Sequence, residues 1–251
     1  RQRAVGSSYP AINTKDVAAL LLNAPLKDEQ TAIARILDTV DESIRQTAAV
    51  IEKLKKIKTG LLHDLLTRGI DENGQLRDPV RHPEQFKDSP IGSVPREWGV
   101  LRVGDLLASK GGHVQTGPFG SQLHSSEYTS SGVPVVMPQD IGADGQITLD
   151  SIAKITFFRA KDLARHFLKI NDIVFARRGD LSRCASISTR EEKWICGTGC
   201  LLMRPPAQAV RAGWFTSLYK HDICQRQIAA RAVGSTMVNL NTGLILGLTV
   251  P

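Results

Sequence analysis

The most regular pattern of apolar and polar positions runs from about Asp28 to Gly69. Its apolar residues recur at alternating steps of four and three residues, and the stripe continues to Leu65 after a local slip in phase. Such a narrow stripe is typical of a helix that packs along another helix in a coiled coil. The residues that we predict to make this helix pairing are Ile33, Leu37, Val40, Ile44, Ile51, Leu54, Leu61 and Leu65.

The sequence also marks the limits of this helix. Pro25 precedes it, Asp28 and Glu29 place negative charge in its first turn, and Gly69 closes it. A helix of about 40 residues is roughly 60 Å long, which is more than a small domain needs. We therefore predict a long coiled-coil spacer helix over residues 26–69, with a long helix inside an ordinary helical domain as the alternative.

After residue 69 the long periodic stripe ends, and the sequence is composed of shorter segments. Residues 70–90 are rich in proline, which interrupts helices and strands, and we expect an irregular connector there. From residue 91 to 251, short strand-like runs alternate with Gly- and Pro-containing turns, and two stretches read as helices, 157–168 and 212–232. This mixture predicts one compact α+β domain.

The two ends of the chain resemble each other. When Arg3 is set against Arg231, seven of twelve positions are identical, at Arg3, Ala4, Val5, Gly6, Ser7, Asn13 and Thr14. A period of 228 residues indicates two copies of a globular domain and not a solenoid. Residues 1–25 are thus expected to be the tail of a preceding domain repeat. Either the chain is cut from a longer protein, or its two ends serve equivalent positions in a dimer.

Composition narrows the class of protein. Lys and Arg outnumber Asp and Glu by 32 to 25, and this balance favours an anionic partner, with nucleic acid first. No apolar run reaches the length of about 18 residues that a membrane span needs, so we expect no membrane association. The four cysteines form no dense disulfide framework and no export signal is visible, which predicts reduced, buried thiols in a cytoplasmic protein.

Several segments, in this order, resemble the specificity subunit of type I restriction–modification systems. The long helix matches through PLKDEQTAIARILDTVDESI and IEKLKKIKTGLLHDLLTRG, and the connector through RDPVRHPEQFKDSPIGSVPREW. The final domain matches through TGPFGSQL, GVPVVMPQDI, NDIVFARRGDLSRCA, GTGCLLMRP and AVGSTMVNLNTGLILGLTVP. The resemblance covers essentially the whole chain.

This resemblance implies both a fold and a role. It implies that residues 91–251 form a target-recognition domain that reads one half of a bipartite site in double-stranded DNA, and that the long helix pairs antiparallel with a second long helix. The helices would carry adenine methyltransferase subunits, which a restriction subunit joins for cleavage. S-adenosylmethionine, ATP and Mg²⁺ are then expected on the partner subunits, with no cofactor, metal or catalytic residue in this chain. Because only one whole recognition domain is present, a homodimer through the long helix is a second way to complete the assembly.

A protein that reads duplex DNA needs cations for phosphates, hydrogen-bonding side chains for base edges and loops that approach closely. Two segments fit this need, a loop of small residues flanked by glutamines and a strand end rich in arginine. The predicted DNA-binding residues are Gln115, Thr116, Gly117, Phe119, Gly120, Ser121, Gln122, Arg177, Arg178, Arg183 and Lys193. A tight structural turn around a core Phe119 and a solvated strand end are the alternatives. For the polar segment Ser235, Thr236, Asn239 and Asn241, which has a counterpart near Asn13, a shared structural role is favoured over base reading.

Patterns for catalysis are weak. Gly197–Thr198–Gly199 begins like a dinucleotide-binding loop but lacks the further glycine. Asp180 with Glu191–Glu192–Lys193 mimics a metal-dependent nuclease without the expected strand context. The loose spacing of Cys196 and Cys200 favours buried thiols over zinc. Two alternatives to a DNA reader remain: a stand-alone nuclease or methyltransferase, and a coiled-coil interaction protein with no DNA role.

Overall fold

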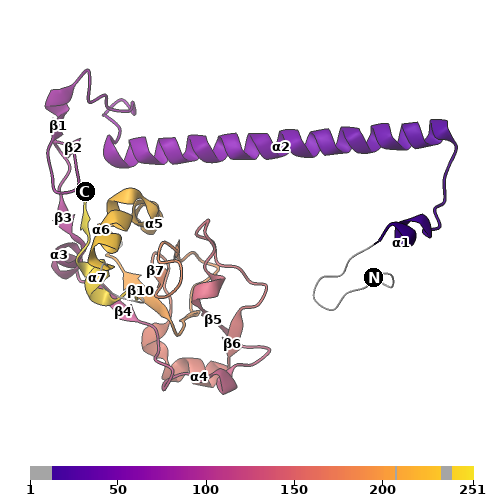
Figure 1. Ribbon diagram of the computed structural model, residues 1–251. Coiled ribbons are helices and arrows are strands. Elements are labelled where there is room, and N and C mark those ends of the chain that lie inside the picture. The colour runs from indigo at the N-terminus through magenta and orange to yellow at the C-terminus, as the bar shows by residue number, and fades with distance from the viewer. Residues whose placement is uncertain (1–12, 207, 233–238) are drawn as a thin grey trace. The chain divides into compact units, whose positions relative to one another are not determined.

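The computed structural model describes residues 13–206, 208–232 and 239–251 (Figure 1). The chain divides into two compact units, Arg1–Lys58 and Thr59–Pro251. The first contains helix α1 (Thr14–Ala18) and most of helix α2 (Lys27–Thr67), and α2 continues into the second unit. Within the described residues, no helix is both long enough and apolar enough to cross a membrane.

Helix α2 confirms the long helix predicted from the apolar stripe, with ends within two residues of those expected from Gly69 and the acidic first turn. At its start, Gln30 Nε2 donates to the Pro25 carbonyl at 2.6 Å. Beyond its end, Gly69 takes a φ of +62°, and a Cβ there would lie 2.5 Å from the Trp98 ring, so glycine satisfies both the left-handed turn and the close packing. The eight predicted pairing residues are between 39% and 61% exposed within this single chain.

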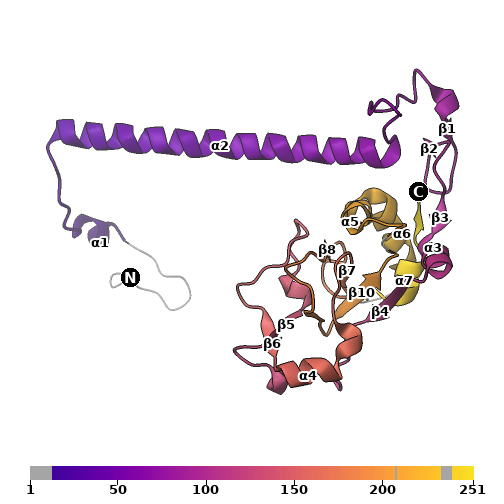
Figure 2. The ribbon, with the colours of Figure 1, turned by 180° about the vertical axis from the view of Figure 1, so that it is seen from behind.

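The second unit is a mixed α/β domain (Figure 2). Its helices are α3 (Val103–Lys110), α4 (Phe157–Asp162), α5 (Ala212–Lys220), α6 (Asp222–Ala232) and α7 (Thr242–Leu246). Its strands are β1 (Phe86–Lys87), β2 (Val94–Pro95), β3 (Leu101–Arg102), β4 (His113–Thr116), β5 (Val133–Val136), β6 (Ala153–Ile155), β7 (Ile173–Ala176), β8 (Cys184–Ser186), β9 (Ile195–Cys196), β10 (Cys200–Arg204) and β11 (Thr249–Val250). Four short 3₁₀ turns are also present: η1 (Pro83–Gln85), η2 (Ser125–Glu127), η3 (Pro138–Asp140) and η4 (Ala164–His166).

Strand β10 is central to a four-stranded antiparallel sheet of order β4-β10-β7-β8. A smaller sheet has the order β6-β5-β9, in which β5 and β9 run parallel. Two further pairs, β1 with β2 and β3 with β11, are isolated. The predicted α+β class is therefore confirmed for this unit.

The two faces of β7 and β10 enter two different hydrophobic clusters, because successive side chains of a strand point to opposite sides. Phe175 and Leu201 pack with residues of α5, α6 and α7, whereas Val174 and Leu202 pack with residues that include Val136 of the smaller sheet. In both views, α5 and α6 lie on one side of the four-stranded sheet, and β5, β6 and α4 lie on the other (Figures 1 and 2). The central strands are thus covered on both faces.

At the end of the sheet where β10 finishes, a buried ion pair fixes the strands. Arg204 donates to both carboxylate oxygens of Asp172, at 2.8 and 2.6 Å, and also to the Phe167 carbonyl. Asp172 is 1% exposed, and the backbone N–H of Lys169 donates to it as well. Such a two-point contact restricts geometry more than a single hydrogen bond does.

Some predicted elements differ in detail. The connector is not wholly irregular: Phe86 of β1 pairs with Pro95 of β2, and this two-stranded pair tolerates proline because no further strand needs its missing N–H. The helix predicted over 212–232 is interrupted at His221, which has an extended backbone, and gives α5 and α6. The stretch 157–168 forms the short helix α4 and the turn η4 instead of one helix.

One buried residue is unusual. His166 is 1% exposed, and neither of its ring nitrogens has a hydrogen-bond partner in the described part of the chain. Burial, and then the nearby charge of Arg165, lower the pKa of His166 to about 4. The folded protein therefore holds this ring neutral over a range of acidic pH in which the unfolded chain would protonate it.

This difference predicts a pH-dependent loss of stability. Between pH 7 and pH 5 the unfolded state takes up a proton at His166 and the folded state does not, so the free energy of unfolding falls by about 2 kcal/mol on account of this group. In His166→Leu, that part of the loss should disappear. Urea unfolding of both proteins at the two pH values measures it, and an equal loss in both would contradict the assignment.

Candidate nucleic-acid interface

The register of the four-stranded sheet brings the predicted DNA-binding segments to one edge. Strand β4 ends at Thr116, opposite Leu201, and β7 ends at Ala176, opposite Cys200, while β8 begins beside this point at Cys184. Three connections therefore leave the sheet at the same edge. We call residues 115–122, 177–183 and 197–199 the loop edge.

The first of these connections is held tightly at Gly117. Its backbone N–H donates to the Cys200 carbonyl at 2.9 Å, and a Cβ at this position would lie 2.0 Å from the carbonyl oxygen of Gly197. Only glycine fits between these two backbones. Gly120, three residues later, has open space around it. The loop is thus fixed at its base and open at its tip.

The tip carries an exposed aromatic residue. Phe119 is 56% exposed, so it is not the core residue that the structural alternative expected. Its backbone N–H donates to Gln122 Oε1 at 3.0 Å, and Gln115 Nε2 donates to the Arg165 carbonyl at 2.6 Å. Each glutamine therefore uses one amide atom within the fold. Gly120, Ser121 and Gln122 are exposed, whereas Thr116 is half-buried.

The three arginines of the second connection have different environments. Arg177 is half-buried and bridges two segments: its backbone N–H donates to the Gly199 carbonyl, and its Nε donates to the Leu240 carbonyl at 3.0 Å. Arg183 forms an ion pair with Asp180 at 3.5 Å. Arg178 is exposed, and its side chain forms no hydrogen bond or ion pair with the described residues. Of the three, Arg178 is the one whose charge is free for a ligand.

Lys193 lies away from this group. Strand β8 leaves the sheet at Ser186, opposite Ile173 at the other end of β7, and the chain then passes through Lys193, whose backbone N–H donates to the Leu168 carbonyl. The structure therefore brings together the loop at 115–122 and the arginines, but not Lys193.

Conversely, Thr198 and Gly199 belong to the loop edge although their sequence suggested only a weak dinucleotide motif. The sequence feature that could have placed them there is their position between two apolar strand-like runs, which indicates a turn between two strands.

The repeated polar segment has a structural role where it is described. Asn241 accepts the backbone N–H of Leu244 and caps α7, and Asn13 accepts the N–H groups of Lys15 and Asp16 and caps α1. These two helices have equal length and the same offset of 228 residues as the sequence repeat. Ser235 and Thr236 lie outside the described residues, as do the repeat residues Arg3, Ala4, Val5, Gly6 and Ser7.

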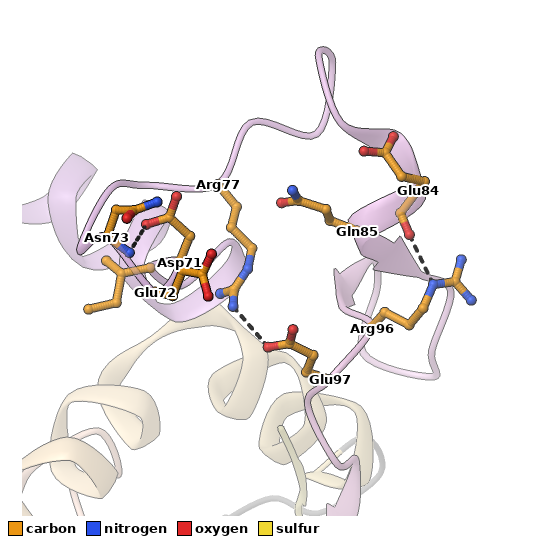
Figure 3. Close-up of a pocket in the computed structure, with 9 residues that line it drawn as sticks. Asp71, Glu72, Asn73, Arg77, Glu84, Gln85, Arg96 and Glu97 are labelled. Carbon is orange, nitrogen blue, oxygen red and sulfur yellow. Dashed lines mark hydrogen bonds and ion pairs between the residues drawn. The ribbon is translucent and has the colours of Figure 1, made fainter.

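A polar hollow of about 1000 Å³ lies in the connector, and none of the predicted site residues lines it (Figure 3). Several of its charged groups make contacts within the fold. Asp71 accepts the backbone N–H groups of Asn73 and Gln75, and the bond from Gln75 is the largest cause that lowers the pKa of Asp71. Arg77 forms an ion pair with Glu97 at 3.1 Å. These contacts order the connector and indicate no ligand.

The four cysteines are buried and unpaired, as the spacing of their positions predicted. Burial raises the pKa of Cys196 to about 12, so this thiol stays protonated at neutral pH and is a poor nucleophile or metal ligand in that form.

No protein-family model matches the chain, but curated relatives do. The type I restriction enzyme MjaVIII specificity subunit of Methanocaldococcus jannaschii is 26% identical over 171 residues, which are 68% of this chain and 36% of the relative. The putative type I restriction enzyme MjaX specificity subunit of the same organism is 34% identical over 104 residues, 41% of this chain and 22% of the relative. The type I restriction enzyme EcoDI specificity subunit of Escherichia coli is 28% identical over 121 residues, 42% of this chain and 27% of the relative. The matches thus span about a fifth to a third of the length of these relatives.

Solved structures share the fold. The type I restriction–modification system S subunit from M. genitalium superposes with a TM-score of 0.54 at 19% identity, over 99% of this chain and 56% of that one. A chain from work on complex assembly and conformational transition of the type I R-M system superposes with a TM-score of 0.50 at 17% identity, over 98% of this chain and 52% of that one. The predicted similarity to specificity subunits is confirmed in sequence, and the combination of a long helix with a mixed α/β domain is confirmed in structure.

The packing at Gly117 predicts that alanine substitution destabilises the protein at Gly117 but not at Gly120 of the same loop. Gly117→Ala forces a Cβ against the Gly197 carbonyl and should lower the free energy of unfolding by about 2 kcal/mol or more. Gly120→Ala meets nothing and should change it by less than about 1 kcal/mol in either direction. Urea midpoints of the two variants measure the difference, and equal midpoints would show that the base of the loop is not packed as described.

Proposed function

We propose that the chain is the DNA-reading part of a type I restriction–modification specificity subunit. In this proposal the domain of residues 91–251 reads one half of a bipartite site in double-stranded DNA, and the long helix scaffolds the adenine methyltransferase subunits, which the restriction subunit joins. The chain itself is not an enzyme. S-adenosylmethionine, ATP and Mg²⁺ belong to the partner subunits, and the complex works in the cytoplasm.

The observation that carries the DNA-reading role is the convergence at the loop edge. A tightly anchored small-residue loop, three arginines and the Thr198–Gly199 turn emerge together from one edge of a rigid sheet. Arginine pairs with phosphate or with two acceptors of guanine, and small residues let the backbone approach DNA closely. A rigid sheet that presents loops of this chemistry suits a surface whose sequence preference is set by loop residues.

The scaffolding role rests on the apolar stripe of α2. Residues such as Val40, Ile44 and Ile51 line a shallow apolar groove along the first unit's part of this helix. An apolar stripe of coiled-coil spacing is stabilised when a second helix covers it. We propose that this second helix runs antiparallel to α2 and comes either from the rest of a longer subunit or from a second copy of the chain.

The N-terminal segment supports the presence of a second recognition domain. At the offset of 228 residues, Ile245, Leu248 and Val250 are 0–2% exposed in the core, where β11 also pairs with β3. Their counterparts Val17, Leu20 and Leu22 are 53–82% exposed. We propose that residues 13–22 close another domain of this fold, as residues 241–250 close this one.

The free charge of Arg178 gives a first prediction for DNA binding. Arg178→Ala should weaken binding of duplex DNA across sequences and reduce the slope of log K against log salt by about 1, because one phosphate contact is lost. The free energy of unfolding of the Arg178→Ala variant should equal that of the wild type.

Arg177→Ala should weaken DNA binding and also lower the free energy of unfolding by about 1 kcal/mol, since the hydrogen bond from Arg177 to the Leu240 carbonyl is lost. Arg226→Ala, an exposed arginine paired with Asp222 on α6, is the control. Wild-type affinity in both Arg177→Ala and Arg178→Ala would remove these residues from the interface.

The function as a whole is tested by methylation. The chain is mixed with its cognate methyltransferase subunit and S-adenosylmethionine on random-sequence DNA, and the methylated adenines are mapped by sequencing. A gapped palindromic target is expected if two copies of the chain pair through α2. A gapped asymmetric target is expected if a different second domain completes the site.

Three further results bear on the proposal. Methylation that is absent, although the methyltransferase is active and the chain is folded, would mean either that a second recognition domain is missing or that the chain has no scaffolding role, and a duplex-binding titration of the chain alone is then the next measurement. Negligible duplex binding at low salt would favour the coiled-coil interaction protein, and metal-dependent cutting by the purified chain would favour an enzyme.

A further inference from the structure

Exposed phenylalanines are concentrated in one part of the domain. Of the seven in the chain, Phe86, Phe175 and Phe215 are buried and Phe167 is partly buried. The other three, Phe119, Phe157 and Phe158, are 56%, 58% and 81% exposed. The core of this domain buries other phenylalanines, such as Phe175 and Phe215. Three exposed rings in one part of the domain therefore indicate a surface that binds a partner.

Two of these rings lie in the first turn of helix α4. Thr156 caps the helix by accepting the Arg159 backbone N–H at 3.2 Å, and Ala160 faces the core with no exposed surface. Phe157 and Phe158 occupy the first two helical positions. Phe158, two residues before Ala160, lies on the opposite side of the helix, whereas Phe157, three residues before it, lies at the margin of the buried side and is still 58% exposed. Lys161 Nζ lies 4.7 Å from the centre of the Phe157 ring, so a cation accompanies the aromatic surface.

Helix α4 is tied directly to the segment that leaves the loop edge. The Arg159 guanidinium donates to the Gln122 carbonyl and pairs with Glu127, and Gln115 donates to the Arg165 carbonyl just beyond α4. The three exposed rings therefore lie on two segments that side-chain contacts hold together. Residues 154–169 also contain five cationic side chains. Arg159 is paired with Glu127 and Asp162, and the described residues show no ion pair for the other four, Lys154, Lys161, Arg165 and Lys169. This charge balance favours an anionic partner over an apolar protein surface.

We propose that Phe119, Phe157 and Phe158 extend the DNA interface as an aromatic contact that stacks on bases and unstacks a base step. Phenylalanine wedges of this kind insert between base pairs and bend the duplex, while neighbouring cations hold the phosphates. Stacking is insensitive to the identity of the base, so this surface adds affinity and DNA distortion while the loop edge selects the sequence. The inference rests on the DNA-reading role proposed above and assigns an additional surface to it.

The test compares Phe157→Ala/Phe158→Ala with Val80→Ala, which shortens another exposed apolar side chain, 86% exposed, in the connector. The full chain is titrated with fluorescent 60-base-pair duplexes of randomised centre at low salt, and unstacked thymines are detected by permanganate. The double variant should bind at least about 10-fold more weakly and lose the permanganate reactivity, because base–aromatic stacking is lost. Val80→Ala should match the wild type. Phe158→Trp should retain both signals, since a larger ring also stacks.

The outcomes separate this inference from the proposed function. If the double variant binds and distorts DNA like the wild type while Arg178→Ala binds weakly, the aromatic contact is wrong and the DNA-reading role stands. The same holds if the double variant loses only its binding to the methyltransferase subunit, which would make this surface a protein interface. If the wild type does not bind duplex DNA at all, both proposals fail together.

Discussion

The pairing of strand β10 on both sides is the constraint on which the rest of the domain depends. Its hydrogen bonds to β4 and β7 fix which residues of three strands end at the same edge, and a shift by one residue would exchange the faces that enter the two hydrophobic clusters. The contact between Arg204 and Asp172 fixes the far end of the same strands. Register, and not any single loop contact, therefore places the small-residue loop beside the arginines.

Several residues of the loop edge make contacts within the fold. Arg177 joins the segments at 199 and 240, and Gln115 and Gln122 each commit one amide atom to a local contact. Such contacts restrict the side chains before any ligand arrives, which lowers the entropy lost on binding. They also mean that a substitution at Arg177 changes stability and binding together, whereas one at Arg178 reports on charge alone.

The sequence was informative where a feature is local or periodic. The stripe from Ile33 to Leu65 predicted α2, Gly69 marked its end, and the repeat at Asn13 and Asn241 matched two capped helices of equal length. It was less informative where pairing between distant strands decides. Nothing in the spacing of Thr116, Arg177 and Thr198 shows that they meet, and nothing near Lys193 shows that β8 carries it to the other end. The break at His221 is accompanied by local contacts, in which its ring accepts the Ile223 N–H and its carbonyl accepts the Cys224 N–H, and by one distant contact, the approach of its ring to His63 at 3.2 Å.

The apolar surface left exposed by this chain divides into kinds that differ in chemistry. The stripe on α2 is aliphatic and periodic, and the segment at Val17–Leu22 repeats a pattern that the core of the domain buries at Ile245–Val250. Both are complementary to protein. The rings at 119, 157 and 158 are aromatic and non-periodic, one of them has the Lys161 ammonium above it, and flat rings of this kind can stack on bases. A periodic aliphatic stripe is covered best by another helix, whereas an aromatic ring can also stack on a base and interact with nearby positive charge. The two kinds of exposed surface therefore differ in the partner that their chemistry favours: other helices and domains for the aliphatic part and, in our proposal, the double helix for the aromatic part.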